Sequence, residues 1–374
     1  MITEIFYNPD LLSEIPQLWG NGLMLVIACI FVYLAIAKGF EPLLLIPIGA
    51  GMILANIPFS GTTDPNGFLT TLKNIGLKTE IFPLLMFLGI GALTDFSALI
   101  RKPITALLGG AAQMGIFVTL ILATILPIFS LQEAGAISII GGADGPTAIY
   151  VATRLAGENL LGPIAISAYS YMALVPIIQP PIMRLLTTKK ERSTVMENTE
   201  VEIPRIAKII FPLIIILLAA LAAPKAAPLL GMLAFGNLLR ESGAVERLSN
   251  TAQNELINIT TILLGLTVGG TMTAAQFLNI GTITIFLLGL VAFCIATASG
   301  VLLGKILYYV TRGKINPLIG AAGVSAVPMA ARVVHQVGQE ENPNNFLLMH
   351  AMGPNVAGVL GSAIAAGVLL QRLG

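Results

Sequence analysis

Long apolar stretches alternate with short polar ones along most of the chain. A helix needs roughly 20 mostly apolar residues to cross a bilayer. About eleven stretches approach or meet that length, at residues 21–38, 40–58, 81–95, 103–130, 134–156, 160–186, 206–224, 256–275, 281–310, 316–336 and 345–371. The pattern therefore predicts an all-α polytopic membrane protein with about eleven transmembrane segments.

Four other regions are too polar to cross. Residues 58–79 and 225–254 carry spaced apolar residues and are typical of amphipathic helices lying at the membrane surface. Residues 187–205 form a hydrophilic linker, and residues 1–20 are polar and acidic, with Trp19 where an interfacial anchor is expected.

Two of the apolar stretches contain helix breakers. Residues 139–147 carry three glycines, Pro146 and Asp144, and residues 316–328 carry two glycines, Pro317 and Pro328. A broken helix at membrane depth is tolerated only where it lines a cavity or is buried in protein. We therefore interpret the two breaks as halves of one site.

The order of these features indicates an internal repeat. Residues 88–94 resemble residues 266–272, and residues 141–148 resemble residues 322–329. Units of five crossings each would have opposite orientations, an arrangement typical of transporters. The predicted division is an N-terminal interfacial segment with an extra helix (1–39), a first repeat (40–186), the linker (187–205) and a second repeat (206–374). Chance similarity between helices rich in glycine and alanine is the alternative.

Basic residues give the predicted orientation. With eleven crossings, Arg101, Lys102, Arg312 and Lys314 share one face of the membrane. Basic loops favour the cytoplasm, so this face is expected to be cytoplasmic. The linker, with Lys189 among its basic residues, then falls on the other side.

Composition supports membrane insertion and excludes several functions. Of 374 residues 56% are hydrophobic and 10% charged, against about 25% charged in soluble domains. A net charge of +1 without a basic patch argues against nucleic-acid binding. Two cysteines within apolar stretches and two histidines argue against a disulfide, a zinc site or a haem site. The sequence contains no phosphate-binding glycine loop, so it gives no support for ATP as the energy source.

Asp144 is the first candidate for chemistry. An unpaired charge at the bilayer centre costs about 2.5–3.5 kcal/mol. A bound cation such as Na⁺ could offset that cost, and the oxygens of unwound carbonyls, Thr147 and Ser138 could help to bind it. The alternative role is that of a helix N-cap. The second break adds Asn316, Ser325 and the carbonyls around Gly320, all neutral, which suits a monovalent rather than a divalent ion. Asn316 as a cap and Ser325 as a packing residue are the alternatives.

Arg332 and two tyrosines are further candidates. Arg332 follows Pro328 by about one helical turn. It could pair with a buried acid, grip a substrate carboxylate with both guanidinium nitrogens, or extend to the lipid headgroups. Tyr169 and Tyr171 lie in one apolar stretch, where we expect one to pack and one to lie near the site.

Several long motifs together resemble one family. They lie at residues 37–47, 141–147, 168–176, 179–183, 316–332 and 350–358. From about residue 23 onwards the chain is similar to the beta subunits of the biotin-dependent, sodium-translocating decarboxylases. That group includes the oxaloacetate, methylmalonyl-CoA and glutaconyl-CoA decarboxylases.

The resemblance implies a multi-pass subunit of the bacterial cytoplasmic (inner) membrane that decarboxylates carboxybiotin and exports Na⁺, consuming a proton. It implies a biotin-carrier domain on another polypeptide, a carboxyltransferase subunit, a small membrane subunit and a homo-oligomer, with no covalent biotin on this chain. A secondary Na⁺-coupled solute symporter without chemistry is the competing interpretation, and a purely structural membrane anchor is a third.

The resemblance also assigns roles to residues. Asp144 would be the Na⁺-binding and proton-coupled acid, and Tyr171, chosen over Tyr169, the proton-handling tyrosine. Arg332 would belong to the same pathway and contact carboxybiotin. Asn316, Gly320 and Ser325 would form a second sodium region.

Overall fold

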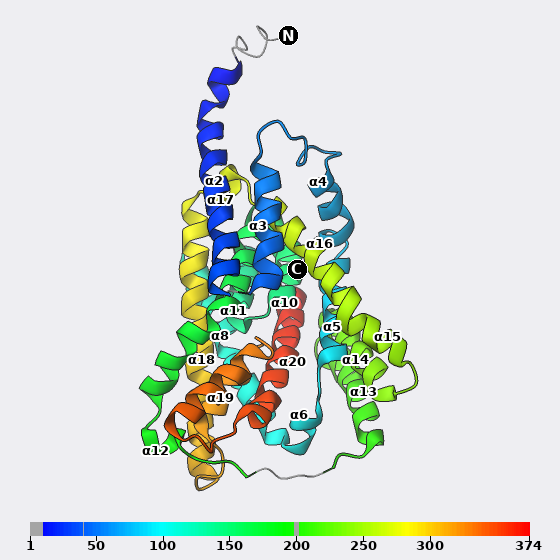
Figure 1. Cartoon of the computed structure of the whole chain (residues 1–374), viewed down its shortest axis with the longest axis vertical. Helices are drawn as coiled ribbons and strands as arrows, with labels where there is room; N and C mark the ends of the chain where they lie inside the picture. The colour runs from blue at the N-terminus through cyan, green and yellow to red at the C-terminus, as the bar shows by residue number, and fades with distance from the viewer. Residues whose placement is uncertain (1–9, 40, 198–201) are drawn as a thin grey trace.

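The computed structural model describes residues 10–39, 41–197 and 202–374. These residues form α-, 3₁₀- and π-helices joined by turns, with no strand among them, so the predicted all-α class is confirmed. The long axis of the bundle runs along α2, which projects at one end (Figure 1). The first part of the predicted N-terminal segment, residues 1–9, and linker residues 198–201 lie outside the described residues.

The helices are given in chain order. The first group is α2 (Asp10–Lys38), α3 (Pro42–Asn56), α4 (Phe68–Leu72), η1 (Lys73–Leu77), α5 (Ile81–Leu93), α6 (Ser97–Arg101), η2 (Pro103–Thr105), α7 (Ala106–Ala112), α8 (Met114–Ile125), α9 (Leu131–Ser138), η3 (Ile139–Gly142), α10 (Gly145–Leu155), α11 (Gly157–Leu186) and α12 (Lys189–Arg192). The second group is α13 (Arg205–Ala222), η4 (Pro224–Ala226), α14 (Ala227–Ser242), α15 (Glu246–Thr251), η5 (Ala252–Leu256), α16 (Ile257–Gly270), α17 (Ala274–Phe277), α18 (Ile280–Val310), η6 (Pro317–Gly323), α19 (Met329–Glu341) and α20 (Leu348–Leu373).

Five described helical segments are long and apolar enough to cross a membrane: Leu18–Lys38, Pro103–Ile125, Leu160–Leu186, Ile280–Val310 and Leu348–Leu373. A sixth results if Phe68–Leu77 and Ile81–Leu93, which meet at a bend of 60°, form one span. The chain is therefore a multi-pass membrane protein.

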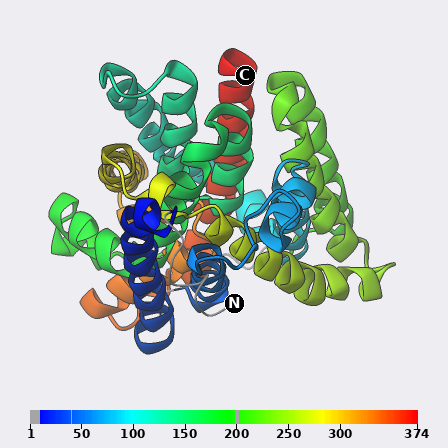
Figure 2. The same cartoon turned by 90° about the horizontal axis from the view of Figure 1, so that it is seen from above.

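Two helix pairs pack so closely that only glycine fits at their crossings. A Cβ on Gly51 of α3 would lie 2.2 Å from the carbonyl oxygen of Leu266 in α16, and one on Gly269 would lie 2.0 Å from that of Ile48. Such contacts let helix backbones touch. The α5–α14 pair shows the same reciprocal contact, at Gly91 with Leu233 (1.9 Å) and at Gly236 with Leu88 (2.0 Å). Figure 2 shows the green-to-yellow helices α13 to α15 along one side of the molecule.

The first broken segment, α9–η3–α10, turns back on itself. Near its start, Gln132 donates a hydrogen bond to the carbonyl of Leu373 (Nε2–O, 3.0 Å). At its end, the side chain of Leu155 lies against Gly374, 3.3 Å from where a Cβ on that glycine would be. Both ends therefore lie at the C-terminal end of α20, and the segment is a re-entrant hairpin, which we call hairpin 1.

The second broken segment, η6–α19, does the same from the other end. At its start, Asn316 donates to the carbonyl of Arg192 (Nδ2–O, 2.8 Å). At its end, Glu341 accepts from the guanidinium of the same Arg192 (Nε–Oε1, 2.8 Å). We call this segment hairpin 2. Gly338 of α19 packs on Leu347, the residue directly before α20. Hairpin 2 therefore lies at the N-terminal end of α20, whereas hairpin 1 lies at its C-terminal end.

These hairpins correct the sequence prediction, in which 134–156 and 316–336 crossed the membrane. With 8, 11 and 13 residues, α9, α10 and α19 are too short to cross, since each residue adds about 1.5 Å to a helix and the apolar layer is about 30 Å thick. Apolar composition reports burial, and a hairpin enclosed by protein is as buried as a crossing helix. The predicted orientation of the linker is also wrong, because Arg192 lies against Asn316, at the end of α18 that carries Arg312 and Lys314.

Candidate ion-binding site

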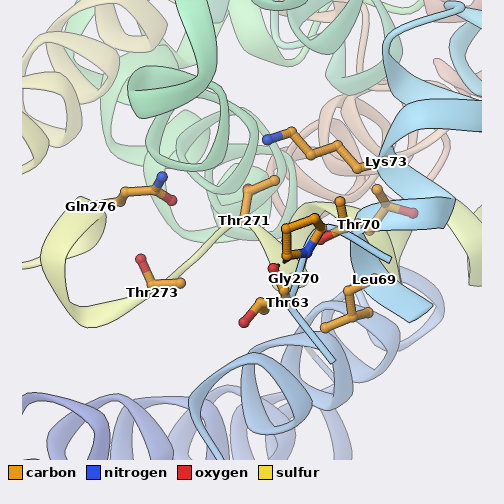
Figure 3. A pocket seen from close by; sticks show the side chains of 10 residues that line it. Thr63, Leu69, Thr70, Lys73, Gly270, Thr271, Thr273 and Gln276 are labelled. Carbon is orange, nitrogen blue, oxygen red and sulfur yellow. Dashed lines mark hydrogen bonds between the residues drawn. The ribbon is translucent and has the colours of Figure 1, made fainter. Parts of the chain in front are cut away.

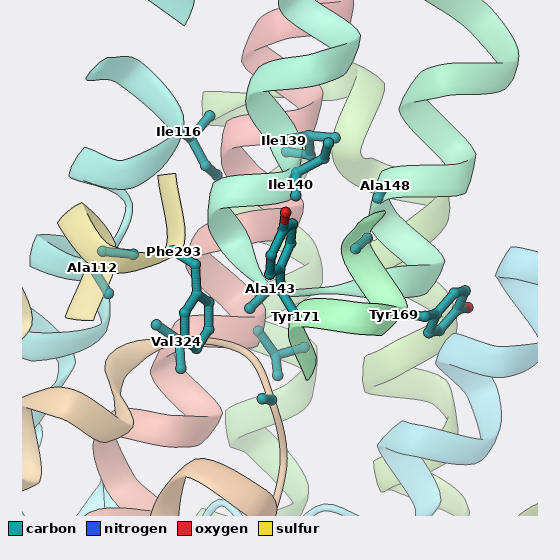
Figure 4. Close-up of a cluster of buried hydrophobic side chains, with 14 of the residues drawn as sticks. Ala112, Ile116, Ile139, Ile140, Ala143, Ala148, Tyr169, Tyr171, Phe293 and Val324 are labelled. Atoms are coloured by element: carbon teal, nitrogen blue, oxygen red, sulfur yellow. The ribbon is translucent and has the colours of Figure 1, made fainter. Parts of the chain in front are cut away.

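The tips of the two hairpins meet inside the protein. The backbone N–H of Ser325 donates to the carbonyl of Gly142 (3.0 Å). Ala143 at the tip of hairpin 1 has the left-handed φ of 53°, which turns the chain sharply before α10. Figure 4 shows Ala143 and Val324 at the two tips, among buried apolar side chains. The two breaks that the sequence singled out therefore lie side by side.

Asp144 lies at this junction and is only 4% exposed. One carboxylate oxygen accepts from the backbone N–H of Thr147 (3.2 Å), so Asp144 is the N-cap of α10. The other accepts from the hydroxyl of Ser362 (2.8 Å), which lies 3.0 Å from the hydroxyl of Ser325. No basic side chain among the described residues forms an ion pair with this carboxylate. Asp144 is thus both a cap and an acid without a counter-charge, and the two roles coexist.

Helix α20 supplies two residues that the sequence analysis did not select as site residues. Ser362 joins Asp144 to Ser325, as described above. Asn355 donates to the carbonyls of Ala322 (3.0 Å) and Val324 (2.7 Å), which holds the tip of hairpin 2, while its own amide oxygen is buried and unpartnered. A serine in a helix rich in glycine and alanine usually serves close packing, so only the contact with Asp144 distinguishes Ser362.

The structure does not bring Asn316 and Gly320 to Asp144. Asn316 lies at the outer end of hairpin 2, where its amide nitrogen donates to the carbonyls of Arg192 and Thr194 (2.8 Å each) and its oxygen accepts from the N–H of Leu318 (3.0 Å). Gly320 packs on α18, where its Cβ would lie 2.0 Å from the carbonyl oxygen of Gly300. Both residues fix where hairpin 2 lies.

The linker itself is buried against hairpin 2 and α18. Glu191 is 2% exposed, accepts from the Tyr309 hydroxyl (3.0 Å) and lies 3.5 Å from the ammonium of Lys305. Burial raises the pKa of the Glu191 carboxyl, but hydrogen bonds from Thr188 and Tyr309 and the charge of Lys305 outweigh it, so the pKa is lowered from its usual value. Glu191 therefore stays ionised and helps to hold the linker beside hairpin 2.

Arg332 lies on the exposed side of α19. Its side chain forms no hydrogen bond or ion pair with another described residue, so pairing with a buried acid is excluded in this conformation. Its guanidinium remains available for a carboxylate ligand or a lipid headgroup.

The two tyrosines occupy different surroundings. The ring of Tyr169 covers Gly145, whose Cβ would lie 2.0 Å from Cε1 of that ring, and its buried hydroxyl has no partner in the described part of the chain. The hydroxyl of Tyr171 donates to the carbonyl of Phe286 in α18. The two side chains point in different directions (Figure 4). Tyr169 is therefore the tyrosine in contact with the residue that follows Asp144.

The side chains around the hairpin tips suit a monovalent cation. Thr147 and Asn355 each have a buried side-chain oxygen without a partner in the described part. With the Asp144 carboxylate they provide hard oxygen ligands that carry one negative charge. No group of three or more His, Cys, Asp or Glu side chains placed so that they could hold a metal ion occurs among the residues described. The donor set therefore fits Na⁺ better than a divalent ion, which usually recruits more carboxylates.

The polar cavity in Figure 3 is separate from this junction. It has a volume of about 300 Å³ and lies between the loop after α3, α4 and the turn after α16. Its polar lining residues are Thr63, Thr70, Lys73, Thr267, Thr271, Thr273 and Gln276. Because no hairpin residue lines it, this cavity gives no direct access to Asp144.

Comparisons with known proteins identify the family. The model of the Na⁺-transporting oxaloacetate decarboxylase beta subunit matches residues 20–373. The chain is 57% identical over 354 residues to the methylmalonyl-CoA decarboxylase subunit beta of Veillonella parvula, covering 95% of this chain and 93% of that one. It is 55% identical over 357 residues to the glutaconyl-CoA decarboxylase subunit beta of Acidaminococcus fermentans (95% and 94% covered). It is 50% identical over 412 residues to the oxaloacetate decarboxylase beta chain of Klebsiella pneumoniae (94% and 95% covered). The chain therefore belongs to the family of Na⁺-transporting oxaloacetate decarboxylase beta subunits.

Proposed function

We propose that this chain is the membrane subunit of a sodium-pumping decarboxylase complex, in which it releases CO₂ from carboxybiotin held by a partner and exports Na⁺. The observation that carries the proposal is the buried Asp144, without a counter-charge in the described part, at the meeting point of two hairpin tips. Relatives act in decarboxylases of three different acids. A subunit shared by all three fits a common intermediate, such as carboxybiotin, better than any one acid.

The chemistry needs a dry site and a proton. Carboxybiotin loses CO₂ when a proton reaches the ureido nitrogen as the N–C bond breaks, and removal of water from the carboxylate favours that step. Asp144 holds either a proton or Na⁺, so Na⁺ binding displaces the proton that the ureido nitrogen takes up. Arg332, exposed on hairpin 2, binds the incoming carboxylate with both guanidinium nitrogens.

The Na⁺ ligands are proposed from both hairpins and α20. Asp144 and Ser325 contribute a carboxylate and a hydroxyl, and Ser362 and Asn355 add two oxygens from α20. Asn316 and Gly320 act by positioning hairpin 2 against the linker and α18. Na⁺ is the cargo, so the site must release it on one side of the membrane after binding it on the other.

We also propose that the fold consists of two inverted repeats, α2–α11 and α13–α20, joined by linker 187–205. The glycine contacts of α3 with α16 and of α5 with α14 are reciprocal. A π-helical turn precedes both α5 (η1) and α16 (η5), and each half contributes one hairpin. Since α2 packs on α3 as α13 packs on α14, α2 belongs to the first repeat rather than being an extra helix. Each repeat then has five crossings and one hairpin, and an odd number inverts the second repeat.

The proposed setting is the bacterial cytoplasmic membrane. The end of the bundle with Arg101, Lys102, Arg312, Lys314 and the linker faces the cytoplasm, because basic residues favour that side. From there a biotin-carrier domain reaches hairpin 2, after a carboxyltransferase subunit has loaded it. A small membrane subunit and further copies of this chain complete the complex.

Reconstitution tests this proposal. Liposomes containing the complex and a biotinylated carrier are expected to release CO₂ and accumulate ²²Na⁺ together, because one protonation step serves both. Omitting the carrier should stop both. Na⁺-coupled solute uptake by this chain alone, without a carrier, would instead establish the symporter.

The two tyrosines can be separated by substitution with phenylalanine. We propose that the unpartnered hydroxyl of Tyr169, rather than that of Tyr171, passes on the proton released by Asp144. Y169F removes this hydroxyl, and we expect it to slow decarboxylation about 100-fold. Y171F loses a hydrogen bond to Phe286, and we expect a stability loss of about 1 kcal/mol with activity retained. The measurements are CO₂ release and thermal unfolding. The reverse pattern would restore the assignment to Tyr171.

A further inference from the structure

Gln113 is a buried polar residue to which the proposed chemistry assigns no role. It lies between α7 and α8 and is 5% exposed. Its amide nitrogen donates to the carbonyls of Gly109 (2.9 Å) and Gly358 (3.3 Å). These two acceptors fix which end of the amide is nitrogen. The oxygen, Oε1, is left without a partner in the described part of the chain.

An unpartnered buried oxygen is costly, about 1–3 kcal/mol, so a ligand at this oxygen would offset a real penalty. The two hydrogen bonds donated by the amide also polarise it and increase the negative charge on Oε1. Both effects favour a small cation as the missing partner.

The oxygen points to the junction of the hairpin tips. Gly142 marks the place, because a Cβ on this glycine would lie 3.1 Å from Ser362 Cβ, 3.3 Å from Ile116 Cδ1 and 3.8 Å from Gln113 Oε1. Ser362 is the residue that donates to Asp144. On the other side, Gly361 packs directly on the Gln113 amide, with its Cβ position 2.8 Å from Nε2. Oε1 of Gln113 therefore lies beside the contact between Gly142 and Ser362, the residue that bonds to Asp144.

We propose that Oε1 of Gln113 is a ligand of the transported Na⁺, a neutral oxygen from α7–α8 that completes the set around Asp144. The inference rests on the proposed function and adds a residue that determines affinity for the ion. Gly142 lets hairpin 1 pack closely on Ser362 and Ile116, which brings the hairpin tip near Oε1. The ion then ties hairpin 1, α20 and the α7–α8 junction together.

Q113M tests the inference, since methionine has nearly the same shape without the oxygen. In the assembled complex, without carboxybiotin, we expect ²²Na⁺ to bind about tenfold more weakly, which corresponds to about 1.4 kcal/mol. The Na⁺ concentration for half-maximal CO₂ release should rise by the same factor, while the rate at saturating Na⁺ changes little. N56L is the matched control: Asn56 is also fully buried with an unpartnered oxygen, but it bonds to Met52 and Met272, away from the hairpin tips. We expect N56L to lower stability and leave Na⁺ binding unchanged.

The outcomes separate this inference from the proposed function. If Q113M lowers only thermal stability, as N56L does, Gln113 is a structural residue and the inference is overturned while the function stands. If D144N binds ²²Na⁺ as tightly as the unaltered complex, the proposed function itself fails. If Q113M does not fold, Q113L replaces it, because leucine is smaller and also lacks the oxygen. Weaker Na⁺ binding by Q113L supports the inference, and unchanged binding overturns it.

Discussion

Replacing Asp144 by asparagine is expected to abolish both Na⁺ transport and decarboxylation, by about 10³-fold or more. Asparagine has the same shape, and its oxygen can still accept from the Thr147 N–H, so the cap of α10 is kept. It has neither a charge for Na⁺ nor a proton to exchange. The measurement is CO₂ release and ²²Na⁺ uptake by the complex in liposomes, with thermal unfolding to show that the fold is intact.

Asp95 provides the matched control for this substitution. It follows α5, is half-buried, and its carboxylate accepts from the backbone N–H of Ser97 (2.8 Å), so it also acts as a local cap. Because Asp95 lies among Lys208, Asn237 and Glu241, away from the hairpin tips, D95N should pump at close to the normal rate. Na⁺-stimulated turnover by D144N would disprove the central role of Asp144, whatever D95N does.

The meeting of the two breaks at Asp144 was predictable from the sequence because its signals are strong and local. Helix breakers and a carboxylate within an apolar stretch have few structural explanations, so Asp144 and the two breaks were found. That the breaks turn back instead of crossing was not predictable, since apolar composition reports burial and not direction. Only the contacts of Gln132 and Arg192 with distant segments show that each hairpin starts and ends at one end of α20.

The supporting residues were harder to find for a different reason. Ser362 in α20 and Gln113 between α7 and α8 are polar residues among mostly apolar neighbours, a pattern that packing alone explains. Their importance depends on where they lie in space relative to Asp144. Ser362 contacts Asp144 although 218 positions separate the two residues in the sequence. Asn316 shows the converse. Its place beside a break suggested an ion ligand, but its amide nitrogen donates hydrogen bonds to two backbone carbonyls of the linker.

Gly320 illustrates how one residue type can indicate two functions. A glycine in an unwound segment suits a carbonyl ligand, and equally a close contact between backbones. The structure shows the close contact, and it is reciprocal. A Cβ on Gly300 would lie 2.2 Å from the carbonyl oxygen of Gly320, just as one on Gly320 would lie 2.0 Å from that of Gly300.

G320A is therefore expected to displace hairpin 2 and reduce Na⁺-dependent decarboxylation about 100-fold, since a shift of about 1 Å at a reacting site can cost that much. The methyl group would meet backbone atoms of α18, which cannot rotate away, so we also expect a loss of about 1–3 kcal/mol in stability. The displacement reaches the site because the N–H of Ser325, five residues further on, bonds to Gly142. Decarboxylation rate and thermal unfolding of the complex measure the two effects.

G300A and G110A determine why Gly320 is glycine. G300A places a methyl group in the same contact from the opposite side, so a packing role predicts the same defect in both variants. Gly110 in α7 has open space at its Cβ position, and G110A should behave like the unaltered protein. Alanine keeps the backbone carbonyl, so a glycine needed only as an ion ligand would tolerate the change. Full activity in G320A and G300A would therefore refute the packing role and return Gly320 to the ion site.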